Sequence, residues 1–178
     1  MAVIEAIATT YLEADAASVT FSGIPSTYEH LQIRMSSRNT FPYRGGTGAL
    51  TFNGTTGTAY STHGMAASSA TNSANPYTGE ANTKMPRLTT GDGIAGTTGG
   101  VDSADFGTAI IDILDYRNAS KNTTVLSMGG NSLTTSTLYI WFASGLFDDV
   151  TVITSITLDS NGSWMRGSEF TLYGLNSS

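Results

Sequence analysis

The sequence predicts an all-β fold, an antiparallel β-sandwich or jelly roll with one long Gly/Thr-rich insertion. Three observations indicate this. Short stretches of alternating hydrophobicity recur along the 178 residues, and no stretch of helical periodicity is comparably strong. Runs of Gly, Thr, Ser and Asn separate the alternating stretches, as turns separate strands. Strands that each offer one apolar face need an opposing sheet, so two packed sheets are expected.

The strand from His30 to Ser36 is the clearest element. Leu31, Ile33 and Met35 share one face and polar residues share the other, because strand side chains alternate. Nine strands are predicted in total, which is enough for two sheets. They are Val3–Thr9, Ser18–Ser22, His30–Ser36, Ala49–Asn53, Thr108–Leu114, Thr123–Met128, Thr137–Ala143, Val150–Asp159 and Glu169–Leu175.

Two connections complete this plan. Residues 159–163 contain Asn161-Gly162 and predict a hairpin turn, since this pair tolerates positive φ angles. Residues 54–107 lose strong periodicity apart from a weak strand at 84–88, so we expect a long exposed insertion stabilised by self-association. We expect one domain over 1–178, with 1–11 as an N-terminal arm.

The strand at 137–143 is apolar on both faces. Leu138, Ile140 and Phe142 share one parity, and Tyr139 and Trp141 share the other. Two interpretations fit: a central strand covered on both sides, or a subunit interface.

Composition excludes several classes of protein. The chain has no cysteine, which rules out disulfides and thiolate metal sites. Its formal net charge of -6 should repel a phosphate backbone, so nucleic acid is not an expected partner. The N-terminus lacks the basic region of a signal peptide, and no apolar run reaches the ~20 residues of a membrane-spanning helix, so we expect no membrane partner.

No constellation of residues predicts catalysis. His30 and His63 are the only histidines, no Gly-x-Ser-x-Gly motif is present, and we interpret both histidines as surface or interface residues. The carboxylates Glu29, Glu80 and Glu169 are isolated in sequence, which does not favour a glycosidase. We therefore expect a protein that is not an enzyme and has no cofactor.

A calcium site is the one metal hypothesis that the sequence raises. Asp92, Asp102 and Asp105 lie in a Gly-rich stretch and could supply oxygen ligands, but their spacing does not match an EF-hand. The favoured interpretation is that these carboxylates are solvated and cap turns, as are those of Asp148 and Asp149. We predict no metal.

Three stretches, 21–33, 50–60 and 167–174, together resemble a family of tailed-bacteriophage virion proteins. The first reads Phe-x-x-Ile-Pro-x-x-Tyr before an alternating strand, the second begins Leu-Thr-Phe-Asn-Gly, and the third ends in Ser-x-x-x-Leu-Tyr-Gly. Members of this family include head decoration and tail-associated β-sandwich proteins. The resemblance implies this fold and a virion setting, and it implies no catalytic residue.

The function that we expect is that of a capsid cement or decoration protein, made in the host cytoplasm and bound to the outer head surface. Its partners would be the major capsid protein and further copies of itself, in a homotrimer. The alternative is a tail-fibre or receptor-binding module that recognises host glycan. The candidate partner-binding residues are Val3, Ile4, Ile7, Tyr11, Tyr43, Tyr60, Tyr77 and Trp141.

Overall fold

The computed structural model of the chain describes residues 3–40, 46–68, 74–82, 84–93, 106–131 and 139–177, and these residues form twelve strands and no helix. The strands are β1 (Val3–Tyr11), β2 (Ala16–Ser22), β3 (His30–Asn39), β4 (Gly46–Phe52), β5 (Tyr60–Ser68), β6 (Ala74–Asn82), β7 (Met85–Gly93), β8 (Gly107–Leu114), β9 (Thr123–Asn131), β10 (Tyr139–Phe147), β11 (Ser155–Trp164) and β12 (Glu169–Asn176). The predicted all-β class is confirmed.

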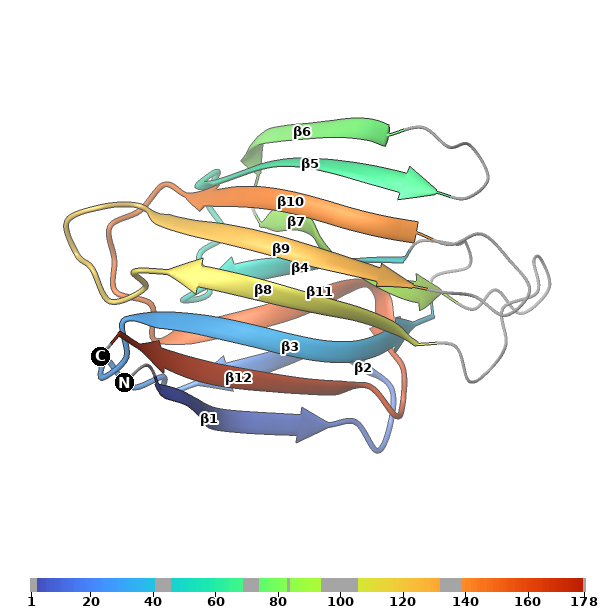
Figure 1. Ribbon diagram of the computed structural model, residues 1–178, viewed down its shortest axis with the longest axis horizontal. Helices are drawn as coiled ribbons and strands as arrows, with labels where there is room; N and C mark the ends of the chain where they lie inside the picture. Colours follow the sequence, from blue (N-terminus) through green and yellow to red (C-terminus); the bar gives the residue numbers. More distant parts are fainter. Residues whose placement is uncertain are drawn as a thin grey trace.

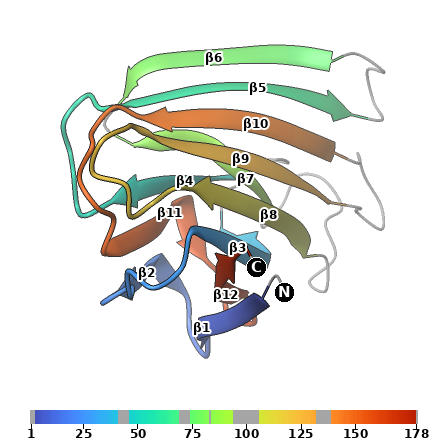
Figure 2. The same ribbon diagram turned by 60° about the vertical axis from the view of Figure 1, so that its left-hand side comes forward.

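The strands form two layers, visible in Figure 2. The long sheet has the order β1-β12-β3-β8-β9-β10-β5-β6, and every pair in it is antiparallel. The short sheet has the antiparallel order β2-β11-β4-β7 and lies behind the long sheet in Figure 1. The last residues of β3, Arg38 and Asn39, also pair with β7 in parallel and so connect the two layers.

The two layers enclose an apolar core, as expected for a sandwich. The long sheet contributes Leu31, Ile33 and Ile111, all fully buried, and the short sheet contributes Leu50 and Ile156. Burying a side chain of this size stabilises the fold by about 1.5–3 kcal/mol. Sandwich packing is thus confirmed, while jelly-roll connectivity stays a prediction.

Aromatic rings fill both ends of the core. Phe147 at the end of β10 contacts Phe52 and Tyr60, with ring centroids 5.2 and 5.0 Å apart. At the opposite end Trp164 packs edge-on against Phe170 at 5.2 Å and donates its indole N–H to the Leu158 carbonyl at 3.0 Å. Such aromatic pairs contribute about 0.5–1.5 kcal/mol beyond their burial.

The prediction that 54–107 is a long exposed insertion is wrong for the described part of that range. It contains β5, β6 and β7, of which the first two extend the long sheet and the third completes the short sheet. Met85 of β7 is fully buried, and its sulfur would lie only 2.1 Å from a Cβ at Gly145, so β7 packs directly under β10. Gly and Thr mask the alternation of these strands, because small side chains give a weak hydrophobic pattern.

The predicted hairpin at Asn161-Gly162 is also wrong. Both residues lie within β11, whose pairing with β2 shifts register between Asp159 and Trp164. The extra residues form an irregularity of the bulge type, so the chain continues in the same direction. The strand predicted from Val150 begins only at Ser155, because the preceding residues form a loop.

The predicted N-terminal arm is an edge strand of the long sheet. β1 pairs with β12 along its length, from Val3 opposite Asn176 to Tyr11 opposite Glu169. Figure 1 shows that the two chain ends consequently lie side by side. A single bulge falls at Ile7, between the pairs formed by Ala6 and Ala8. Bulges on edge strands are common and limit further strand pairing.

Candidate functional site

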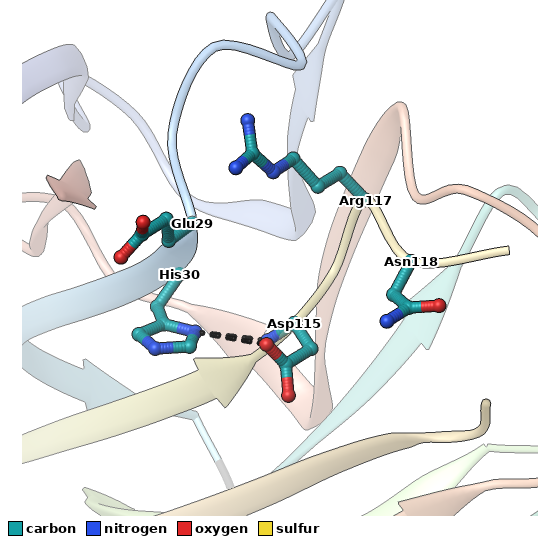
Figure 3. A pocket seen from close by; sticks show the side chains of 5 residues that line it. All are labelled: Glu29, His30, Asp115, Arg117 and Asn118. Atoms are coloured by element: carbon teal, nitrogen blue, oxygen red, sulfur yellow. Dashed lines mark hydrogen bonds and ion pairs between the residues drawn. The ribbon is translucent and has the colours of Figure 1, made fainter. Parts of the chain in front are cut away.

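A shallow cleft of about 430 Å³ lies at the end of the long sheet where β3 begins and β8 ends. Its lining residues are Glu29, His30, Asp115, Arg117 and Asn118 (Figure 3). Figure 3 shows that the side chains do not converge: the Arg117 guanidinium and the Glu29 carboxylate point away from the His30 ring. Arg117 instead donates to the Ser26 carbonyl at 3.3 Å.

The contact between His30 and Asp115 is structural. The His30 Nδ1 accepts a hydrogen bond from the Asp115 backbone N–H at 3.0 Å, while the Asp115 Oδ1 lies 3.7 Å from the same nitrogen. Nδ1 therefore acts as an acceptor in this contact. A catalytic His-Asp pair requires the opposite, a donor nitrogen facing the carboxylate. His30 therefore fastens the left-handed turn at Asp115, where φ is 55°.

The two carboxylates of the cleft are held in their ionised form. An ion pair and hydrogen bond with Lys121 lower the pKa of Asp115. Hydrogen bonds from Ser177, one of them from its backbone N–H at 2.8 Å, lower the pKa of Glu29. A general acid at neutral pH needs a raised pKa, so neither group is suited to that role. The cleft joins loops and the C-terminus at one end of the sandwich.

The metal hypothesis finds no support among the residues that the structure describes. These residues contain no group of three or more His, Cys, Asp or Glu side chains able to hold an ion. Asp102 and Asp105 lie outside the described residues, and so does the side chain of Asp92 in β7.

The predicted partner-binding residues separate into three groups. On β1, Val3, Ile4 and Tyr11 are exposed, and the bulged Ile7 packs partly against the core. Tyr60 and Trp141 are buried, 1% and 7% exposed, so they are not contacts for a partner. The hydroxyl of Tyr60 accepts a hydrogen bond from the Phe52 N–H at 2.9 Å, which gives it a role in the core. Tyr43 and the Tyr77 side chain lie outside the described residues.

An apolar surface lies on the outer face of the long sheet, and sequence reasoning found only its β10 part, as one of two interpretations of that strand. We call it the apolar ridge; it consists of Met65, Leu126, Met128, Ile140 and Phe142. Phe142 of β10 pairs with Met65 of β5 on one side and with Met128 of β9 on the other, so these three form a row across the sheet. The signal was present in the sequence, because Ile140 and Phe142 share the parity opposite to Trp141.

The ridge is large for an exposed apolar surface. Its five side chains are between 39% and 66% exposed. With about 200 Å² for a whole large side chain, they present roughly 500 Å² to solvent. The largest apolar patch on a typical monomer covers about 300–600 Å² and often marks an interaction site. The ridge therefore qualifies as a candidate contact surface.

A groove of about 330 Å³ adjoins the ridge on the same face, over β8, β3 and β12. We call it the outer groove; its walls and floor include Arg34, Ser36, Thr108, Ile110, Glu169 and Tyr173. Arg34 packs over the Tyr173 ring at 5.2 Å, which fixes one wall. Ile110 pairs with Met128 of the ridge, so ridge and groove meet along β8. Figure 1 looks onto this face.

Comparison with known proteins identifies no relative: no protein-family model, no curated protein and no solved structure matches the chain. Within the described residues, no helix is long and apolar enough to cross a membrane.

Proposed function

We propose that the chain is a bacteriophage capsid decoration or cement protein that binds the outer surface of the head as a homo-oligomer, with three copies as the preferred number. The major capsid protein is its other partner. The observation that carries the proposal is that exposed apolar side chains lie on an open sheet face and an edge strand of a rigid sandwich. Flat surfaces of this kind suit contacts between proteins.

The three stretches that resemble virion proteins support the proposal, because two of them pack together. The Tyr28 ring, from the Ile24-Pro25 turn, lies directly over Gly174 in the closing strand. The Tyr28 hydroxyl donates to Glu5 at 3.0 Å, and the Glu29 N–H donates to the Leu175 carbonyl at 2.9 Å. The stretches therefore form one structural unit. This unit has a role in folding the sandwich. That agrees with the resemblance, which implies no catalytic residue in these stretches.

The proposed mechanism is mechanical. A protein that binds across neighbouring coat subunits binds only the assembled shell, so its binding free energy adds to the stability of the shell by mass action. At a concentration 100 times the dissociation constant, each such site contributes about 2.7 kcal/mol. Hundreds of weak sites can thus stabilise a head without any covalent bond.

The edge strand β1 is the proposed contact with the coat. Ile4 and Tyr11 are each 54% exposed at an edge of the long sheet. Truncation of 2–11 would remove one of the two neighbours of β12 and uncover the core beneath Ile7, so substitution is the cleaner test. We expect Ile4→Asp with Tyr11→Ser to reduce head binding, and Val150→Asp, at an exposed loop residue, to leave it unchanged.

The copy number in the particle tests the proposal. Calibrated peptide mass spectrometry of purified virions from the encoding phage would measure this chain relative to the major capsid protein. Hundreds of copies in fixed ratio to the coat are expected. A handful of copies would favour the alternative, a tail-fibre module that binds host glycan, and a glycan array would then test it. Absence from the virion would refute both functions.

A further inference from the structure

We propose that the outer face of the long sheet is the contact between copies of this chain, with the apolar ridge of one copy seated in the outer groove of another. This inference rests on the proposed function, which includes self-association, and it deepens that function by assigning the surface and the partner.

Charge favours a second copy as the occupant. Each chain has a formal net charge of -6, so two copies repel one another unless they meet through a neutral surface. The strands that carry the ridge, β5, β9 and β10, contain no Asp, Glu, Lys or Arg over their 27 residues, nine in each strand. The outer groove carries Arg34 and Glu169, whose charges offset each other, and Asp112 at its margin leaves a net charge of only -1 there. A strongly charged partner would find no complementary field here.

Shape favours it as well. Ile140 projects between small neighbours, with Ala67 opposite it on β5 and Gly130 opposite it on β9. The same cross-strand row continues through Thr108 of β8 to Ser36 of β3, two small residues in the outer groove. One face thus presents a projection and a depression side by side, at the same level along the strands. A two-fold axis between them places each ridge over the groove of the other copy, so this contact closes a pair and gives two copies, in place of the preferred three, as the size of the oligomer.

The area agrees with this arrangement. The ridge alone presents roughly 500 Å², and a stable interface needs about 800 Å² from each partner. Insertion into the groove adds the walls formed by Ile110, Arg34 and Tyr173 to the buried surface. Protein interfaces usually have an apolar core and a polar rim. Here the ridge would form the core, and the groove margins, where Gln32 donates to Asp112 at 2.7 Å, would form the rim.

A charge-exchange experiment on the isolated protein tests the inference. Sedimentation velocity and light scattering would compare the wild type with Ile140→Asp in the ridge and Thr108→Arg in the groove, after circular dichroism has verified folding. We expect the wild type to self-associate. Each variant alone should have a dissociation constant for self-association about 100-fold or more above that of the wild type. An equimolar mixture should regain association, because one ridge–groove contact stays apolar and the other pairs Asp with Arg.

Ile4→Asp is the matched control, since Ile4 is 54% exposed at the edge of the same sheet and Ile140 is 66% exposed. It should self-associate like the wild type. Should Ile140→Asp fail to fold, Thr108→Arg still tests the groove, because Thr108 is an exposed position. A wild type that stays monomeric at a protein concentration of about 100 μM, roughly 100-fold above a micromolar dissociation constant, would overturn the inference. So would normal association of both variants. Normal association with loss of glycan binding in both variants would assign this face to a sugar instead.

Failure of this inference differs from failure of the proposed function. The association experiment contains no capsid, and the copy number in virions requires no knowledge of the self-contact. A self-associating chain that is absent from virions would refute the capsid role alone. A monomeric chain present in hundreds of copies would refute this contact alone.

Discussion

Gly174→Ala should destabilise the fold, although alanine is ordinarily the better residue within a strand. Gly174 lies in β12, opposite Glu5 of β1 and Leu31 of β3. A Cβ built at this position would lie 2.3 Å from the Cγ and 2.4 Å from both Cδ atoms of Tyr28. Ordinary van der Waals contact begins at 3.4 Å, so the overlap with the ring reaches 3.4 − 2.3 = 1.1 Å.

Two opposing effects set the magnitude. Replacing glycine within a strand gains roughly 0.5–1 kcal/mol from the smaller entropy of the unfolded chain. Overpacking costs about 1–3 kcal/mol, and the upper part of that range applies because the clash involves ring atoms of a side chain anchored to Glu5 by its hydroxyl. We expect a net loss of about 1–2.5 kcal/mol. At roughly 2–4 °C per kcal/mol for a domain of this size, Tm should fall by about 2–10 °C.

Urea unfolding followed by tryptophan fluorescence is the assay. The chain has two tryptophans, Trp141 and Trp164, which are 7% and 0% exposed, so unfolding moves both into water. In a Tyr28→Ala background the ring is gone, and Gly174→Ala should become neutral or stabilising. Gly57→Ala, which meets nothing within 4 Å, is the control and should stay within about 0.5 kcal/mol of wild type. A Gly174→Ala protein as stable as wild type would refute the packing argument.

Three further predictions concern the core, a turn and pH. Tyr60→Phe should lose about 1–3 kcal/mol in urea unfolding, because the buried Phe52 N–H loses its acceptor; an unchanged midpoint would contradict this. Asn53 has a φ of 52° and its side chain accepts from two backbone N–H groups at the start of β11, those of Thr154 and Ser155, at 2.8 and 3.2 Å. Asn53→Ala should therefore lower the free energy of unfolding by about 2–4 kcal/mol, and Asn53→Gly, which adopts the positive φ without strain, should lower it less. Equal losses would show that backbone strain at this residue contributes nothing. Glu29 and Asp115 have lowered pKa values, so the stability they confer is present above the unfolded pKa of about 4 and is lost as pH falls through the folded pKa. Tm should therefore drop as pH falls from about 5 to 2, and Glu29→Gln with Asp115→Asn should flatten that profile; an identical slope would show that other carboxylates dominate.

Strong alternation made much of the long sheet predictable. Leu31, Ile33 and Met35 are buried as their spacing predicts, and β3 is a central strand between β12 and β8. The strands β5 to β7 were missed except for part of β7, because Gly, Ala, Thr and Ser dominate them and backbone pairing holds them in the sheet. Asn161-Gly162 misled for a related reason. A turn signal is local, while the pairing of β11 with its neighbours extends past it.

Tyr60 and Trp141, predicted as partner contacts, are buried by packing that no local sequence pattern encodes. Tyr60 stacks on Phe147, which is 87 residues later in the chain, and Trp141 faces inward beside the fully buried Ala143. Large aromatic residues suit both interfaces and cores. Sequence position therefore gave no means of choosing between these environments. The exposed β1 residues were easier to identify, since an edge strand has a neighbour on one side only.

The strand apolar on both faces carries the most functional information, and the fold rules out one of its two interpretations. β10 lies between β9 and β5, with Trp141 and Ala143 directed into the core. In a two-layer sandwich a sheet has one covered face, so the opposite parity must point outward. Ile140 and Phe142 are accordingly exposed. The structure rejects a central strand covered on both sides by this chain. The interface interpretation stays a prediction, and the contact between copies that we propose, ridge in groove, is the form of it that can be tested.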